Sequence, residues 1–158
     1  MNPIRTILVP VDFRPSSEAA LDEAVRYAHA LGAEITLLHV QPFALSDVPE
    51  ELFYPSANTS VRMRTSTLKR LSNLAESRRS AGVPIQVELR EGIAWDEIIG
   101  AADRLNADLI VIGAHEDTGL TRRLLGNVAD RVARTARVPV MTVRASVARE
   151  RRTEYASR

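Results

Sequence analysis

The sequence contains no cysteine and no long apolar run, and its charges almost cancel. Without cysteine, disulfides, thiolate metal sites and cysteine nucleophiles are excluded. The apolar stretches fall short of the roughly 20 residues that a transmembrane helix needs. The formal net charge of +1 argues against a basic surface built for nucleic acid or for an anionic membrane. We therefore expect no nucleic-acid partner and no membrane association.

Several enzyme motifs and targeting signals are also missing. Residues 1–5 lack the apolar core and the cleavage site of a signal peptide, which favours a cytoplasmic location. The chain has no P-loop, no dinucleotide fingerprint after its first apolar run and no serine-hydrolase elbow. A phosphoreceiver domain would carry an acidic pair after its first strand, and only Asp12 stands there.

Apolar runs and helical patterns alternate along the chain. Runs typical of buried strands cover residues 4–11, 34–40, 83–89, 108–112 and 138–143. Helical spacing predicts helices over 17–31, from 59 or 60 to about 80, over 95–105 and over 128–136. Pro15, Ser16 and Ser17 offer a cap for the first helix. Strands that are apolar on both faces and alternate with helices indicate one α/β domain with a parallel sheet over 1–144, followed by a polar tail over 145–158.

One segment indicates anion binding. The strand 108–112 stops at Gly113, and a long loop then leads to Gly126 and Asn127, which open an amphipathic helix. Free backbone N–H groups and the helix dipole gather at such a start and suit a phosphate. The alternative is a surface loop with an ordinary helix cap.

Three blocks of sequence resemble the universal stress protein family. They are ILVPVD at 7–12 with Ser16 and AAL at 19–21, DLIVIGAH at 108–115 continuing through TGL at 118–120 and LLGNVA at 124–129, and VPV at 138–140. The resemblance covers residues 3–144. It implies a five-stranded parallel sheet in the order 3-2-1-4-5, with two helices on each face. Ligands of open α/β sheets bind where the strand order reverses, here between strands one and four.

The resemblance also implies an adenine-nucleotide site with identifiable residues. Asp12 matches the family residue that contacts the nucleotide, although such an acid also caps turns. Val40 is a candidate lining for the base, and His115 stands where the family often carries histidine. The implied nucleotide-binding residues are Asp12, Val40, Gly113, His115, Glu116, Gly126, Asn127 and Val128.

This site departs from the pattern of ATP-binding members. Their loop has a glycine at the place of Glu116 and a serine or threonine at the place of Asn127. A carboxylate near a triphosphate repels it by about 1 kcal/mol or more, so we expect weak or absent ATP binding. Arg122 and Arg123 are possible phosphate contacts, with a solvated charge pair as the alternative. A metal site at Asp12, His39 and His115 is conceivable, but we expect no metal and no certain cofactor; ATP or AMP would bind weakly.

The sequence thus predicts a stress-response binding and signalling protein with a degenerate nucleotide site and no catalytic residues. The alternative is a slow ATPase or phosphotransfer enzyme, for which Asp12 and Glu116 are the only obvious acids. Protein partners cannot be named from the sequence. The strand 138–143 is short and apolar and would lie at the sheet edge, which predicts a homodimer paired through it.

Overall fold

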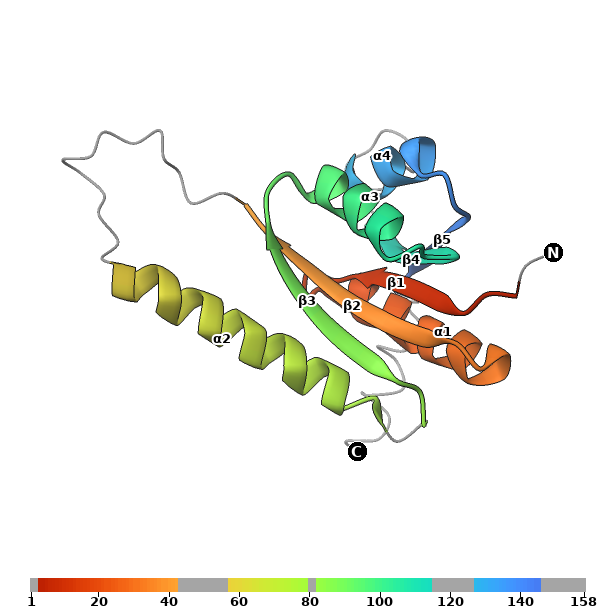
Figure 1. The fold of residues 1–158 in the computed structure, drawn as a ribbon, viewed down its shortest axis with the longest axis horizontal. Coiled ribbons are helices and arrows are strands. Elements are labelled where there is room, and N and C mark those ends of the chain that lie inside the picture. The colour runs from red at the N-terminus through yellow and green to blue at the C-terminus, as the bar shows by residue number, and fades with distance from the viewer. Residues whose placement is uncertain (1–2, 43–56, 80–81, 115–126, 146–158) are drawn as a thin grey trace, which may run out of the picture.

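The computed structural model of the chain has one parallel sheet covered by helices on both faces (Figure 1). It describes residues 3–42, 57–79, 82–114 and 127–145. Within these ranges, five strands lie in the order β3-β2-β1-β4-β5. The strands are β1 (Thr6–Pro10), β2 (Glu34–Gln41), β3 (Ile85–Glu91), β4 (Leu109–Ala114) and β5 (Val140–Arg144). The predicted α/β fold and its implied strand order are confirmed.

Four described helices form the outer layers, and each face of the sheet has its own apolar cluster. The helices are α1 (Pro15–Leu31), α2 (Ala57–Glu76), α3 (Ala94–Arg104) and α4 (Asn127–Thr135). Leu21 of α1 and Leu71 of α2 pack with Val9 on one face, and all three are fully buried. Ile98 of α3 and Val132 of α4 pack on the other face. Because the odd and even residues of β1 point to opposite faces, this strand contributes to both clusters.

The start of α1 differs from the expected serine cap. Arg14 occupies the capping position in an extended conformation and makes no side-chain cap bond. Pro15 takes the first helical position, where a missing N–H costs nothing. The Ser17 hydroxyl instead donates to the Arg14 carbonyl oxygen and accepts the Asp12 backbone N–H, at 3.0 and 3.3 Å. The serine therefore ties the end of β1 to the first turn of α1.

The central pairing of β1 with β4 is short. It joins Ile7 to Leu109 and Leu8 to Ile110, whereas the pairing of β1 with β2 continues to Pro10. Successive residues of a parallel strand direct their backbone groups alternately to the two neighbouring strands. The Val11 N–H faces β2, where it donates to the Leu38 carbonyl oxygen at 2.8 Å, so the nitrogen of Pro10 faces β4. Proline has no N–H to donate there. The ladder ends before Pro10, at the point where the strand order reverses.

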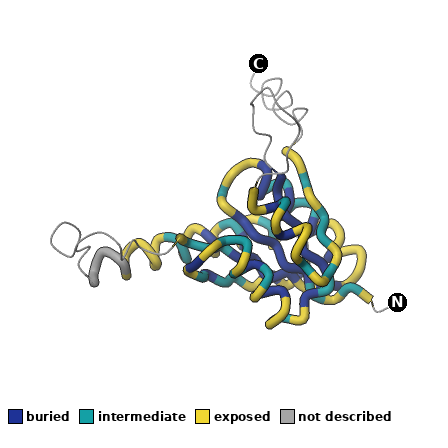
Figure 2. Tube along the Cα trace, turned by 90° about the horizontal axis from the view of Figure 1, so that it is seen from above, coloured by how far each residue is buried: buried dark blue, intermediate teal, exposed yellow. Residues whose placement is uncertain are grey.

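The two edges of the sheet differ. β5 pairs with β4 on one side only, and α2 runs beside β3 at the other edge. The amino-terminal part of α2 projects beyond the sheet (Figure 2), where Val61 and Met63 are each 62% exposed. None of the described helices is long and apolar enough to cross a bilayer.

Candidate functional site

A cavity of about 430 Å³ opens at the carboxyl ends of β1 and β4, where the strand order reverses. This volume lies within the range of small-molecule and cofactor sites. Residues from β1, the turn after it, β2, β4, α1, α3 and α4 surround the cavity. They are Pro10, Val11, Asp12, Arg14, Ser17, Leu38, Val40, Ala94, Ile98, Ile112, Gly113, Asn127, Val128 and Ala129.

Five of the residues predicted from the sequence line this one cavity. They are Asp12, Val40, Gly113, Asn127 and Val128, which come from four separate stretches of the chain. His115, Glu116, Arg122, Arg123 and Gly126 lie outside the described residues. The described part of the loop motif therefore meets the opening motif in space, as the topology rule requires.

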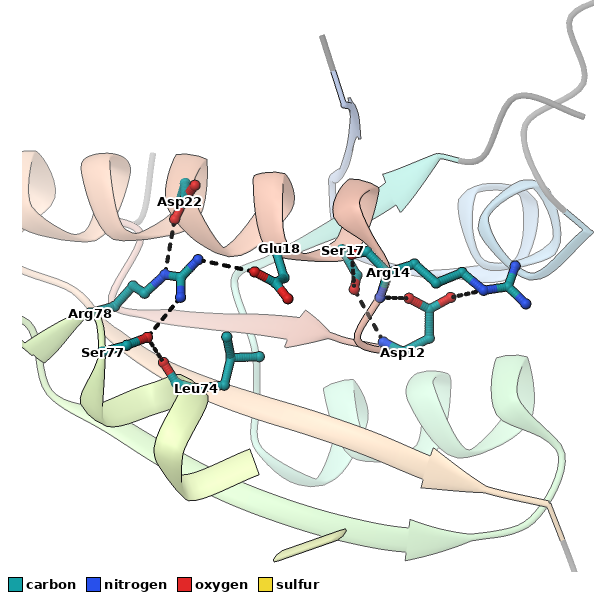
Figure 3. A network of polar contacts seen from close by, with 8 residues as sticks. All are labelled: Asp12, Arg14, Ser17, Glu18, Asp22, Leu74, Ser77 and Arg78. Carbon is teal, nitrogen blue, oxygen red and sulfur yellow. Dashed lines mark hydrogen bonds and ion pairs between the residues drawn. The ribbon is translucent and has the colours of Figure 1, made fainter. Parts of the chain in front are cut away.

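Asp12 stands at the mouth of the cavity in a tight turn. Its Oδ1 accepts the backbone N–H of Arg14 at 3.1 Å, and its Oδ2 lies 3.8 Å from the Arg14 Nε (Figure 3). Its side chain is 45% exposed. The carboxylate thus shapes the turn that precedes α1 while it remains accessible to a ligand.

Gly113 holds β4 against the start of α1. A Cβ at this position would lie 2.6 Å from the Ser16 carbonyl carbon and 2.6 Å from the Ser17 nitrogen. Both are backbone atoms and cannot swing away, so only glycine fits without a shift of the helix. Gly113 is therefore required by the packing of β4 against α1, independently of any ligand.

The floor of the cavity is apolar, and one of its walls is the start of α4. Leu38 and Val40 of β2, Ile98 of α3 and Ile112 of β4 supply aliphatic surface that suits a flat ring. Asn127 begins α4, whose first backbone N–H groups have no partner within the helix. The site thus combines an apolar floor with polar groups at its rim.

An ion-pair cluster fixes the start of α3, which carries Ala94 and Ile98 into the cavity. Arg90 at the end of β3 donates from Nε to Glu97 Oε2 at 2.6 Å, and from Nη1 to Glu88 Oε1 at 3.3 Å. Arg104 at the end of α3 also pairs with Glu88. The bond to Glu97, and next the bond to Glu88, raises the pKa of Arg90 above its ordinary value. The guanidinium therefore stays charged, and it clamps α3 to the edge of the sheet.

His39 is used for packing and not for the cavity. Its Nδ1 donates to the Val11 carbonyl oxygen at 2.7 Å, and its ring lies 4.7 Å from that of Phe13. The Arg70 guanidinium lies over the Phe13 ring, at 4.1 Å from its centroid. Among the described residues, no three acidic or histidine side chains gather in a way that would hold a metal.

Sequence reasoning missed Arg14 and Ser17, and most of the apolar floor. Arg14 is two residues beyond Asp12, in a turn whose course the sequence does not specify. Leu38 and Ile98 belong to apolar patterns that predict core, and position along a strand or helix does not reveal which buried residue borders a cavity. The sequence signal that could have identified Arg14 as a cavity residue is its position two residues after Asp12.

An open α/β sheet with a crevice at its strand reversal defines a doubly wound fold of the nucleotide-binding type. The sequence pattern of the universal stress protein family matches residues 3–144. Universal stress protein MJ0531 of Methanocaldococcus jannaschii is 33% identical over 147 residues, which span 90% of this chain and 84% of that protein. The chain belongs to the universal stress protein family.

Solved structures share the fold. The structure of MJ0577, from the same organism, has a TM-score of 0.76 at 25% identity and covers 92% of this chain and 99% of that one. A universal stress protein in complex with cAMP has a TM-score of 0.72 and covers 92% of this chain and all of that one. At 24% identity, this second likeness bears on the fold alone.

Proposed function

We infer that this universal stress protein binds an adenine nucleotide in the cavity at the ends of β1 and β4 and acts as a stress-response binding and signalling protein. The observation that carries this proposal is the composition of the cavity. An apolar floor at Val40 and Ile98 suits the base, and the Asp12 carboxylate at the rim suits donors such as ribose hydroxyls. The ligand class therefore rests on the lining of the cavity itself.

AMP-sized ligands fit the proposal better than ATP. Glu116 replaces a glycine of the ATP-binding pattern and Asn127 replaces a hydroxyl residue. Glutamate adds a negative charge, and we expect it to oppose the outer phosphates of ATP. Asn127 is a milder change, because its amide still caps a helix and donates to an oxygen.

The experiment that tests this function has two parts. Mass spectrometry of the ligand released from freshly purified protein identifies what the cavity takes up. Calorimetry with adenosine, AMP, cAMP and ATP then ranks the affinities. Binding of AMP or cAMP with weaker ATP binding supports the proposal, and no binding of any of the four contradicts it.

The alternative is a slow ATPase. Hydrolysis needs a general base near the phosphates. Asp12 is the only carboxylate among the described residues that line the cavity, and its Oδ1 already accepts the Arg14 backbone N–H. Release of phosphate from ATP by the purified protein separates the two functions, and we expect none above the background rate.

We propose that two copies of the chain form a homodimer by pairing through β5. Val140 and Val143 of this edge strand are only half-buried, and each packs on one face of the sheet. An edge strand with apolar side chains invites pairing with a second copy. Two-fold pairing of β5 with itself would bury both edges.

A further inference from the structure

The described lining of the cavity carries two charged side chains, Asp12 and Arg14, and they hold each other loosely. The 3.8 Å between Arg14 Nε and Asp12 Oδ2 is at the outer limit of an ion pair. The Arg14 side chain is 68% exposed, so most of its surface is open to solvent at the cavity mouth. A guanidinium has five N–H donors, and this contact occupies little of that capacity.

The main chain of Arg14, in contrast, is fixed. Its carbonyl oxygen accepts the backbone N–H groups of Ser17 and Glu18, at 3.0 and 3.1 Å, and the Ser17 hydroxyl at 3.0 Å. Its own N–H donates to Asp12. Figure 3 shows the side chain leaving this anchored point and running away from α1 past the Asp12 carboxylate. Because the main chain is fixed, the guanidinium, with its unused N–H donors, is the part of Arg14 that can turn toward a bound anion.

We propose that Arg14 contacts the phosphate of the bound nucleotide, so that the cavity selects a nucleoside monophosphate over the neutral nucleoside. This inference rests on the proposed function of the same cavity. When the ligand binds, the guanidinium turns from Asp12 to the phosphate, which leaves the carboxylate to accept hydrogen bonds from the ligand. The amino-terminal end of α4, on another wall of the cavity, adds partial positive charge on the ligand's side.

The sign of the charges makes the role of Arg14 specific. Asp12 alone would give the described lining a negative charge and would repel a phosphate. Arg14 cancels that charge and supplies planar donors that match phosphate oxygens. Without Arg14, the described lining would keep the negative charge of Asp12 and lose its one cationic side chain, so anionic ligands would lose affinity and a neutral nucleoside would not.

The test compares AMP with adenosine by calorimetry on the full chain. We expect Arg14→Gln to weaken AMP on the order of tenfold or more, and to leave adenosine within about twofold. Arg14→Lys keeps the charge and should retain part of the preference for AMP. In the native protein, AMP affinity should fall with added salt, and in Arg14→Gln this dependence should flatten.

Arg26→Gln is the matched control, because it removes the same charge from α1 at an exposed position that does not line the cavity. Arg26→Gln should change the affinity for neither AMP nor adenosine. If the native protein binds AMP but Arg14→Gln weakens AMP and adenosine equally, or weakens neither, the role of Arg14 is wrong and the proposed function stands. If the native protein binds cAMP or ATP but not AMP, this inference fails and the proposed function stands. If it binds none of adenosine, AMP, cAMP and ATP, the proposed function fails and this inference fails with it.

Discussion

Gly113 lies so close to Ser16 that a Cβ on the glycine would stand 2.6 Å from the serine's carbonyl carbon. Gly113→Ala should therefore push β4 and α1 apart, and we expect a loss of about 1–3 kcal/mol in the free energy of unfolding, typical of overpacking. Urea denaturation followed by circular dichroism measures this.

Gly100 provides the opposite case within the same protein. It lies inside α3 on an exposed face, and a Cβ there meets nothing within 4 Å. Gly100→Ala should stabilise the protein by about 0.5–1 kcal/mol, because alanine loses less backbone entropy in a helix. If both alanine variants shift stability in the same direction, then close approach to α1 is not what distinguishes Gly113.

Arg78 joins α1 to the end of α2. Its Nε lies 3.1 Å from Asp22 Oδ1 and its Nη2 lies 3.4 Å from Glu18 Oε2 (Figure 3). The Arg78 side chain is only 23% exposed, so this network is screened less than a surface pair. Arg78→Met keeps the apolar stem and should cost about 1 kcal/mol of stability at low salt, and less at 1 M salt.

The control for Arg78 is Arg26, whose pairing with Glu23 is a solvent-exposed contact one turn apart on α1. Arg26→Met should change stability by less than about 0.5 kcal/mol. An equal loss in the two variants would mean that the Arg78 network does no more than an ordinary surface pair.

Glu116 should limit ATP binding. Glu116→Gly should strengthen ATP binding by about fivefold, the equivalent of removing about 1 kcal/mol of repulsion. Glu116→Gln separates the causes, because it removes the charge and keeps the bulk. No change in either variant would mean that Glu116 does not act on the phosphates, and micromolar ATP binding by the native protein would contradict the degenerate site.

The dimer should depend on β5. Light scattering at micromolar concentration should give twice the chain mass of 17.4 kDa, and Val140→Lys should reduce it to the monomer. Gln86→Lys is the matched control, because it adds the same charge to an exposed position on β3, the opposite edge strand. A dimer that survives Val140→Lys would have to form through another surface.

The period and type of the elements were predictable from the sequence, and their limits were less so. The helix after Pro15 and its end at Gly32, which adopts the left-handed conformation with φ of 66°, follow from local chemistry. β3, by contrast, was expected over 83–89 and spans Ile85–Glu91. Its limits are set by pairing with β2, from Ile35 with Ile85 to Gln41 with Glu91. β2 is far from β3 in the sequence, so the pattern of residues 83–91 alone does not show where their pairing begins and ends.

Some residues of the candidate site could likewise be predicted from the sequence, and others could not. Asp12, Gly113 and Asn127 stand in recognisable motifs, and topology alone brings them to one crevice. Arg14 belongs to no motif, and its place at the cavity mouth follows from the turn that Asp12 and Ser17 hold together. A sequence pattern does not reveal a residue such as Arg14, because the conformation of a turn brings it to the cavity.

Pro10 has a consequence for how this protein can change. The crevice opens where the β1–β4 ladder ends, and that end coincides with a missing backbone N–H. Gly113, on the strand opposite, sets how near α1 approaches. Main-chain chemistry at these two positions therefore shapes the backbone beside the cavity, while the side chains around it decide what enters. Ligand preference can drift by substitution at the rim, at Arg14 or Val128 for example, without loss of the fold that supports the crevice.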